Sequence, residues 1–425
     1  MTALFKSFDS LDMKRGEAVV VAVSGGSDSL ALLLAAQSYI ETRGKHWSLH
    51  AVTVDHGLRE ASAGEAELVA ALCAARGISH RTMRWTGRKP ATGIMAAARE
   101  ARMALLSQCA AELGARVVLV GHTADDQAET IAMRRMRGEG RGIAGIALAT
   151  LYRGRVWFVR PLLGCRRQDL RDWLGARQIS WIDDPSNENR NYERVATRKQ
   201  LAGTGVEDLL KVQREAMAKR LADNARLASF CDSYLDLDAD RRLVVNRDAL
   251  LDLPHDVALL AIKVLSAVAG GATHLPDEAS AERLLEQLVH GRGGSLSRAV
   301  IAPRQGLIAF TREQRGLPKI DLARVDTGKP FMWDGRFEGT LLSPASGYVV
   351  AHGRAAEPAL FCEGEPVEED VQNKFLALER VVAPWAHLLP SFDLTLATAI
   401  GKVIGARIPL TLPLRGHNGR QGLTE

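Results

Sequence analysis

Residues 17–159 alternate short runs of β-branched residues with longer stretches of helical periodicity. This alternation constrains the fold most, because helices that cross between successive strands produce a parallel sheet covered on both faces. The predicted strands are residues 18–23, 49–54, 78–85, 117–120 and 156–159, and the predicted helices between them are 30–42, 61–76, 94–113 and 127–136. We therefore predict an α/β domain with a doubly wound parallel sheet, whose ligands bind beyond the carboxyl ends of the strands.

The chain has 425 residues, which is more than a single hydrophobic core usually organises, so we expect several domains. We predict the α/β domain at residues 1–205, a linker helix at 206–235, a helical and then β-rich second domain at 236–329, and a C-terminal region at 330–425. Residues 296–310 and 336–351 alternate like strands and are punctuated by glycine and proline. The part beyond the linker helix is therefore predicted to be a smaller α+β region.

A loop rich in glycine and serine follows the first predicted strand. It consists of Ser24, Gly25, Gly26, Ser27, Asp28 and Ser29. Glycine lets the backbone approach a ligand closely, and the amides at the start of the next helix favour an anion, so we predict a phosphate cradle. The loop lacks the Gly-Lys-Ser or Gly-Lys-Thr that ends a Walker loop. Asp28 is a candidate to hold Mg²⁺ against the phosphates. The alternative is a turn that only caps the helix.

A second polar segment follows the predicted strand 117–120 and continues into a predicted helix. His122, Asp126 and Glu129 are spaced at i, i+4 and i+7, so we expect them on one helix face. Such a group can bind a cationic side chain or Mg²⁺, and it can remove a proton from an attacking amine. Asp125 is a further cleft candidate in this segment. The alternative is an acidic helix N-terminus that is only solvated.

Other candidates are more dispersed. Asp55 and His56 end the predicted strand 49–54, where we expect a contact with a nucleotide sugar or a metal. Arg99 and Arg102 lie on the predicted helix 94–113, where each by itself is more often a surface charge than a catalytic residue. Arg198 is a candidate for a cleft or RNA contact.

The chain is basic, with a net charge of +5 and a pI near 9.0, which favours a polyanionic partner. Basic residues gather in one region: Arg160, Arg166, Arg167, Arg171, Arg177, Arg190, Arg194, Arg198, Lys199, Lys211, Arg214, Lys219 and Arg220. Contacts of such residues with phosphates supply most of the salt-dependent affinity for nucleic acid. Acidic residues are interspersed among them, so a solvated, ion-paired face is the alternative.

The five cysteines are scattered without a CxxC pair, which suits reduced thiols in a cytoplasmic protein. The first residues lack the apolar core of a secretion signal. Charged residues and a proline interrupt the apolar stretch 392–414, so we expect no membrane span there.

The loop of residues 24–29 resembles the PP-loop of N-type ATP pyrophosphatases, which cleave ATP between its α and β phosphates. Residues 54–59 (Val-Asp-His-Gly-Leu-Arg), 121–130 (Gly-His-Thr-Ala-Asp-Asp-Gln-Ala-Glu-Thr) and 160–163 (Arg-Pro-Leu-Leu) follow in order. Together these motifs resemble the tRNA(Ile)-lysidine synthetase family. The resemblance covers residues 17 to about 200 and, loosely, residues 293–313.

This resemblance implies an ATP- and Mg²⁺-dependent ligation of L-lysine to the wobble cytidine of a tRNA(Ile) with a CAU anticodon. The reaction would pass through an adenylated tRNA and change the codon that is read from AUG to AUA. It implies that Asp126 and Glu129 recognise lysine, that Asp28, Arg99 and Arg102 join them in catalysis, and that residues 330–425 contact tRNA. We also expect that the protein can form a homodimer.

Two segments depart from the family pattern. Residues 137–143 carry Glu139 and a spacer one residue shorter, and residues 194–198 keep two arginines but lose an asparagine. Gly140, Gly142 and Gly145 match a dinucleotide-binding fingerprint, but they follow a predicted helix rather than a strand, so we predict no such site.

Three alternative functions stay open from the sequence. A PP-loop enzyme that thiolates tRNA would typically use cysteine pairs. A PP-loop amide-forming enzyme, such as NAD or GMP synthetase, would act on a small nucleotide or its precursor. A basic RNA-binding module with a degenerate loop would not cleave ATP.

Overall fold

The computed structural model describes residues 2–58, 62–138, 140–183 and 205–415. The chain forms two compact units. The first unit comprises Met1–Arg220, Pro390–Phe392 and Leu410–Glu425, and the second comprises Leu221–Leu389 and Asp393–Pro409.

The first unit is built on a mixed but mainly parallel sheet. Its strands are β1 (Ala18–Ala22), β2 (Ser48–Asp55), β3 (Ser79–Arg84), β4 (Val117–Leu119), β5 (Ala149–Tyr152) and β6 (Val156–Val159). They lie in the order β5-β6-β4-β1-β2-β3, and every neighbouring pair is parallel except β5 with β6. The predicted doubly wound sheet is confirmed, and β5 is an addition to it. β5 forms a hairpin with β6 through a turn with Arg153 and Gly154 at φ of 48° and 68°, the left-handed region that tight hairpins use.

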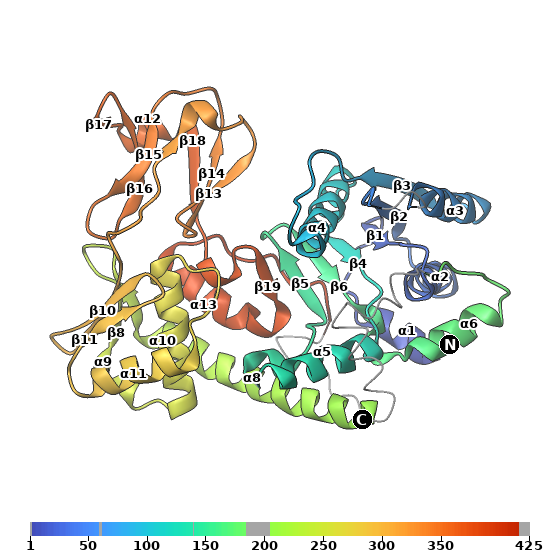
Figure 1. The fold of residues 1–425 in the computed structure, drawn as a ribbon, viewed down its shortest axis with the longest axis horizontal. Helices are drawn as coiled ribbons and strands as arrows, with labels where there is room; N and C mark the ends of the chain where they lie inside the picture. Colours follow the sequence, from blue (N-terminus) through green and yellow to red (C-terminus); the bar gives the residue numbers. More distant parts are fainter. Residues whose placement is uncertain (1, 59–61, 139, 184–204, 416–425) are drawn as a thin grey trace. The chain divides into compact units, whose positions relative to one another are not determined.

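Helices cover both faces of this sheet. They are α1 (Thr2–Asp9), α2 (Ser27–Thr42), α3 (Ser62–Ala75), α4 (Ile94–Glu112), α5 (Ala124–Met136) and α6 (Arg167–Gly175). Helices α2 and α3 lie on one face of the sheet and α4 on the other, as Figure 1 shows, which is the arrangement that right-handed crossovers produce. Helices α1 and α6 pack against α2, with Phe8 stacked on Tyr39 at 5.4 Å between ring centroids. Helices from the start of the chain and from beyond β6 thus complete the core of the first unit.

Strand β1 lies at the point where the strand order reverses. The chain leaves β1 for β2 and β3 on one side, and returns to the other side of β1 with β4. Open α/β sheets bind ligands at such a point, because the loops after the two adjacent strands lead to opposite faces and leave a crevice. Here those loops are the glycine-serine loop after β1 and the segment that contains Gly121. A Cβ on Gly121 would lie 3.0 Å from the carbonyl oxygen of Asp28, so the two segments are in close contact.

The second unit combines helices with antiparallel sheets. Helix α8 (Val206–Tyr234) leads into it and is followed by α9 (Arg247–Leu251), α10 (His255–Gly270), α11 (Glu278–Val289), α12 (Glu369–Gln372) and α13 (Leu394–Ile404). One sheet, in the order β7-β8-β11-β10-β9, consists of β7 (Leu235–Leu237), β8 (Leu243–Asn246), β9 (Gly294–Leu296), β10 (Ala299–Arg304) and β11 (Leu307–Arg312). The predicted α+β character of this region is confirmed.

Two further sheets lie in the later part of the second unit. The first consists of β12 (Ile320–Asp321), β15 (Tyr348–His352), β16 (Glu357–Cys362) and β17 (Glu365–Pro366), and the second of β13 (Pro330–Trp333), β14 (Phe337–Leu341) and β18 (Leu376–Arg380). Strand β19 (Leu388–Pro390) precedes α13. Trp333, Phe337 and Leu376 are buried in one core cluster between the strands.

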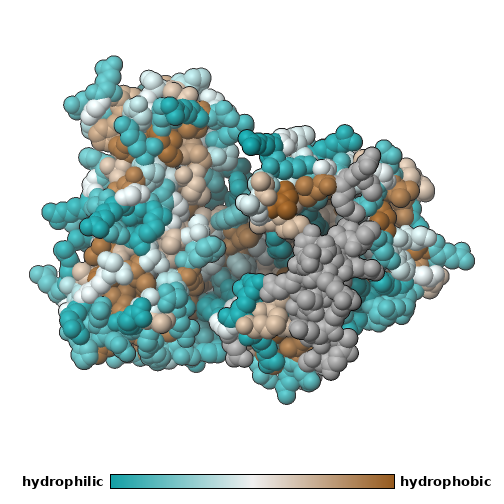
Figure 2. Space-filling view, in the orientation of Figure 1, coloured by the Kyte–Doolittle hydropathy of each residue, from teal (hydrophilic) through white to brown (hydrophobic). Residues whose placement is uncertain are grey.

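The visible surface is mainly hydrophilic. Figure 2 shows hydrophobic residues in small separate groups among hydrophilic ones. Among the residues that the structure describes, none of the helices has both the length and the apolar character needed to cross a bilayer.

Candidate active site

The loop after β1 is closed on itself by its serines. Ser29 Oγ donates to the Gly26 carbonyl oxygen at 2.9 Å and accepts from the Ser24 amide at 3.1 Å. Gly25 has φ of 85°, where a side chain is strained, and a Cβ there would lie 2.6 Å from Ile182 Cδ1. The Ile182 amide also donates to the Gly25 carbonyl oxygen at 2.9 Å. A segment distant in sequence therefore fixes the loop, and only glycine fits at position 25.

Helix α2 begins directly at this loop. Its N-cap residue is Gly26, which has no side chain to cap the first amides of the helix. The positive end of the helix is therefore directed at the loop, as a phosphate cradle requires. Ser27 and Ser29 are buried, whereas Ser24 is exposed at the mouth of the loop.

Helix α5 begins after β4 with a capping box. The Thr123 side chain accepts from the Asp126 amide at 3.4 Å, and Asp126 Oδ2 accepts from the Thr123 amide at 2.8 Å and from its hydroxyl at 2.9 Å. Because α5 begins at Ala124, His122 lies in the turn before the helix and not on its face. The prediction of one helical face therefore holds for Asp126 and Glu129 and is wrong for His122.

One guanidinium joins the loop after β1 to the acidic face of α5. Arg167 Nε donates to Asp28 Oδ2 at 2.9 Å and its Nη2 donates to Asp126 Oδ1 at 3.2 Å, while its Nη1 lies 3.5 Å from Glu129 Oε1. Burial alone would lower the pKa of Arg167, but the carboxylates of Asp126, Asp28 and Glu129 outweigh it and raise the pKa above its ordinary value. We call these four residues the Arg167 cluster. Within this cluster, three carboxylates face one guanidinium.

Asp125 holds the helix that carries Arg167. Its Oδ2 accepts from the Arg167 amide at 2.7 Å, and its Oδ1 accepts from Arg166 Nη2 at 3.1 Å. Burial opposes ionisation, but these hydrogen bonds and charges lower the pKa of Asp125. Its carboxylate thus fastens α6 to α5, which fixes where the Arg167 side chain begins.

Comparisons with known proteins agree with this geometry. A family model described as a PP-loop domain matches residues 2–204. The tRNA(Ile)-lysidine synthase of Mesorhizobium japonicum is 40% identical over 97% of this chain and 97% of its own. Proteins with the same name from Rhizobium meliloti and Brucella anthropi are 42% and 36% identical, over 77% and 94% of this chain and 74% and 96% of their own. The chain belongs to the tRNA(Ile)-lysidine synthase family. The protein is therefore an enzyme with an ATP-using PP-loop domain, and the resemblance expected from the sequence is confirmed.

The predicted site residues Asp55 and His56 of the first unit make contacts at the end of β2. Asp55 is buried at the end of β2, where its Oδ1 accepts from Ser62 Oγ at 2.7 Å and from the Gly57 amide at 2.8 Å. The hydrogen bond from Ser62 is the main cause of its lowered pKa. His56 is half-buried and packs edge-on against Trp85, with 6.2 Å between ring centroids. Asp55 therefore shapes the turn between β2 and α3.

The predicted arginines of α4 form part of a basic group. Burial and then repulsion from Arg99 lower the pKa of Arg102, and the same two causes lower the pKa of the buried Arg160 to about 9. Burial and then repulsion from Arg102 also lower the pKa of His56. The charge of Arg99 thus acts on both Arg102 and Arg160, and that of Arg102 acts on His56. Arg198 lies outside the described residues.

The glycine-rich segment after α5 serves packing. Gly145 has φ of 75°, and a Cβ there would lie 2.4 Å from Gln127 Oε1. The Gln127 amide exchanges two hydrogen bonds with the backbone of Ile146, at 2.7 and 2.8 Å. The segment follows a helix and includes the 3₁₀ turn Arg141–Ala144, so it lacks the strand that precedes a dinucleotide site.

From the sequence, Arg167 was predicted only as one of the basic residues that could contact RNA. One signal could have distinguished it, because Arg167 occupies the first turn of α6, where the helix dipole disfavours a cation. A cation at that position must be held by other charges. Arg171, one turn later, points the same way, with its Nε 3.4 Å from Ser27 Oγ.

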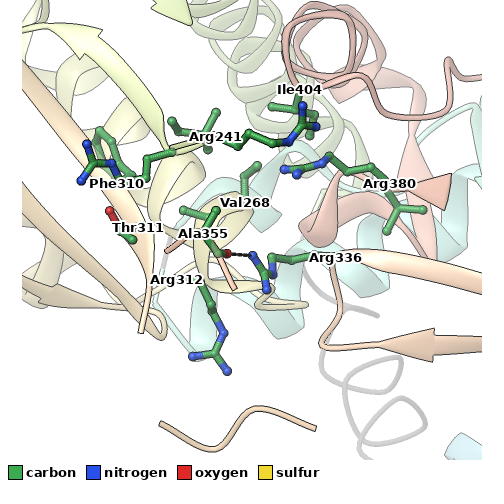
Figure 3. A pocket seen from close by; sticks show the side chains of 13 residues that line it. Arg241, Val268, Phe310, Thr311, Arg312, Arg336, Ala355, Arg380 and Ile404 are labelled. Atoms are coloured by element: carbon green, nitrogen blue, oxygen red, sulfur yellow. Dashed lines mark hydrogen bonds between the residues drawn. The ribbon is translucent and has the colours of Figure 1, made fainter. Parts of the chain in front are cut away.

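A second charged cluster lies inside the second unit. A pocket there is lined by Arg241, Arg242, Arg312, Arg336 and Arg380 together with apolar residues such as Val268, Phe310 and Ile404 (Figure 3). Arg336 Nη1 donates to the Ala355 carbonyl oxygen at 2.9 Å, the hydrogen bond drawn in Figure 3.

Two carboxylates form ion pairs with five arginines in and around this pocket. Asp334 pairs with Arg298, Arg312 and Arg336, and Glu357 pairs with Arg241 and Arg380. Burial, and then repulsion from Arg241 and Arg336, lower the pKa of Arg380 to about 10. Positive charge therefore exceeds negative charge in this network, in contrast to the Arg167 cluster.

Proposed function

We propose that this enzyme uses ATP to attach the side-chain amine of L-lysine to the wobble cytidine of a tRNA(Ile) with a CAU anticodon. The observation that supports this most directly is the Arg167 cluster. Asp28 of the phosphate cradle and Asp126 and Glu129 of the acidic helix contact the same guanidinium. This contact supports the proposal, because an ATP site at the cradle and an ammonium site at Asp126 and Glu129 would then be adjacent, as a two-step ligation requires.

In the first step, the carbonyl oxygen of the cytosine ring attacks the α-phosphorus of ATP. The bond between the α-phosphorus and the bridging oxygen to the β-phosphorus breaks, and pyrophosphate leaves. The α2 amides beside Gly25 and Gly26 would bind the departing phosphates. Asp28 fits a cation, since its Oδ2 already faces one at 2.9 Å, and it would hold Mg²⁺ together with phosphate oxygens. When bound, Mg²⁺ would offset the charge of the phosphates.

In the second step, the lysine amine attacks the activated ring carbon and AMP leaves with the former carbonyl oxygen. Asp126 and Glu129 would bind the lysine ammonium, and one of them would accept the proton that the amine loses. Arg99 and Arg102 would offset charge on the leaving pyrophosphate of the first step. The modified base would change the codon that is read from AUG to AUA.

The decisive experiment supplies the purified enzyme with that tRNA, ATP and radiolabelled lysine. We expect label in the tRNA, with one AMP and one pyrophosphate formed per lysine, and loss of incorporation in Asp28→Ala. Asp326→Ala is a matched control, because the Asp326 carboxylate is 70% exposed and pairs only locally, with Lys329 at 2.7 Å. Absence of incorporation by the wild type, or full incorporation by Asp28→Ala, would overturn the proposal.

The tRNA contact proposed for residues 330–425 is supported by the arginine-lined pocket, since this region contributes Arg336 and Arg380 to it. An RNA phosphate would offset the excess positive charge there. Arg241→Gln tests this without emptying the core, because that side chain is 57% exposed. We expect weaker tRNA binding and a salt slope reduced by about 1. Unchanged affinity and slope would exclude the pocket from the tRNA interface.

Two further expectations belong to the proposal. The enzyme would act in the cytoplasm, where its tRNA substrate is found, and as a homodimer. Light scattering during gel filtration measures the mass of the particle, and the mass of a monomer would exclude the dimer.

A further inference from the structure

The position of Arg167 bears on the order in which substrates bind. Asp126 presents two oxygens, and Oδ2 is engaged by the amide and hydroxyl of Thr123 at 2.8 and 2.9 Å. The other oxygen, Oδ1, faces Arg167 Nη2 at 3.2 Å. Glu129, which is buried, faces Arg167 Nη1 through Oε1 at 3.5 Å. The guanidinium thus occupies the position where these two carboxylates would hold the ammonium of lysine.

Arg167 cannot leave this position by losing its proton. Although burial opposes it, the three carboxylates raise its pKa above the ordinary arginine value, so it stays charged at any working pH. It leaves the carboxylates by exchange of partners, and an anion that binds it more strongly would draw it away. Phosphate groups are such anions, since guanidinium and phosphate form paired, charge-assisted hydrogen bonds.

The phosphate cradle lies within reach of Arg167. Its Nε is 2.9 Å from Asp28 Oδ2, in the first turn of α2, and one turn along α6 the Arg171 Nε is 3.4 Å from Ser27 Oγ. Helix α6 therefore directs two arginines at the start of α2, where the amides that would bind phosphate are found. A rotation of the Arg167 side chain toward bound phosphates would move it from Asp126 and Glu129 without moving α6, which Asp125 holds in place.

We propose that Arg167 is a positioning residue that makes lysine binding depend on ATP: its guanidinium competes with the lysine ammonium for Asp126 and Glu129 until the phosphates of ATP draw it away. This inference rests on the proposed function. Its consequence is that ATP and lysine bind with positive coupling, and that lysine is admitted when the base can be activated. By linkage, lysine must tighten ATP binding by the same factor.

The test measures the dissociation constant of labelled lysine for the full-length wild-type enzyme without tRNA. Equilibrium dialysis with Mg²⁺ is done with and without saturating α,β-methylene-ATP, which resists cleavage at the relevant bond. We expect the nucleotide to tighten lysine binding by a factor of about 5 or more. Equal affinity with and without the nucleotide overturns the inference and leaves the proposed function intact. No lysine binding under either condition also overturns the inference, and the incorporation assay then decides the proposed function separately.

Variants of Arg167 separate competition from a purely structural role. Arg167→Met removes the competing charge, so lysine should bind without nucleotide at least as tightly as to the wild type, and the nucleotide effect should fall to near 1. Arg167→Lys should retain part of the coupling. Arg81→Met is the matched control, since Arg81 forms an exposed pair with Glu112 at 3.2 Å, and its coupling should equal that of the wild type.

A structural role gives a different result. If Arg167 only braces the site, Arg167→Met weakens lysine binding by the same factor with and without nucleotide, and the inference fails. Circular dichroism checks that the variant is folded. Should it not fold, the wild-type measurement alone still decides, because the coupling is a property of the unmodified enzyme.

Discussion

Asp126 has two roles in the structure, and two substitutions separate them. Its Oδ2 completes the capping box of α5 with Thr123, while its Oδ1 lies 3.2 Å from Arg167 Nη2. Asparagine keeps an oxygen that can accept the hydrogen bonds of Thr123 but carries no charge. Alanine removes both the charge and the half of the capping box that the Asp126 side chain supplies, while the Thr123 side chain can still accept from the backbone amide of residue 126.

The two roles have different magnitudes and different readouts. Loss of the hydrogen bonds from Thr123 to the side chain of residue 126 costs about 1 kcal/mol, so the free energy of unfolding of Asp126→Ala should lie about that far below that of Asp126→Asn. Both variants lose a charge-assisted hydrogen bond to the lysine ammonium, worth about 1.5–3 kcal/mol. That loss corresponds to a KM for lysine raised about 10- to 150-fold in both.

Urea unfolding followed by circular dichroism measures the first quantity, and initial rates of lysine incorporation at varied lysine concentration measure the second. Asp326→Asn serves as the control for the loss of an exposed carboxylate. Equal stability of the two Asp126 variants would refute the capping role. A KM for lysine near that of the wild type in either variant would refute the role in substrate binding.

Three other predictions follow from the same region. Gly121→Val places a Cβ about 3.0 Å from the carbonyl oxygen of Asp28, so the backbone of one of the two segments must shift. We therefore expect a lowered Tm and weaker ATP binding. A Tm equal to that of the wild type would contradict the close contact. Gly145→Ala adds a Cβ 2.4 Å from a side-chain amide oxygen of α5 at a φ of 75°, and should cost about 1–2 kcal/mol of stability, measured by urea unfolding. Burial by itself would raise the pKa of the Asp125 carboxyl. Hydrogen bonds from Arg166 and from a backbone amide of α6 outweigh burial and lower this pKa, so folding favours the ionised form. This stabilisation is present above the unfolded pKa of about 3.8 and is lost as the pH falls through the lower folded value, so Asp125→Asn should lose less stability between pH 5 and pH 2 than the wild type.

The strands and helices of the first unit were predictable because each has a local periodicity. The predicted strand 156–159 coincides with β6, and the predicted helix 94–113 with α4 to within one residue. Strand β5 was missed, because Ala149–Tyr152 contains a single β-branched residue, whereas the equally short β6 is a run of valine and aromatic residues. The segment after β4 was treated as helical from His122 onward, whereas α5 begins at Ala124, so His122 was assigned to a helical face that it does not share.

The site divides in a similar way between local and distant information. Gly25 and Gly26 predict the phosphate cradle, because glycine between a buried strand and a helix lets the backbone approach a ligand closely. The sequence could not show that Asp125 turns toward α6 while Asp126 faces Arg167, because both are neighbours in the chain and their partners lie 41 residues or more away. The hydrogen bonds of Asp125 and Asp126 with Arg167 determine which way each carboxylate faces. Arg167 is in place to form them because α6 packs against α2.

By itself, the sequence determined that a phosphate-binding loop follows β1 and that an acidic segment follows β4, since each motif is encoded in consecutive residues. The tertiary structure decided that these two strands are neighbours and that an arginine from α6 faces both motifs. The physical reason is that strand order depends on which crossovers bury the helices best, a property of the whole sheet. The competition proposed for Arg167 therefore arises from three segments that become adjacent only on folding.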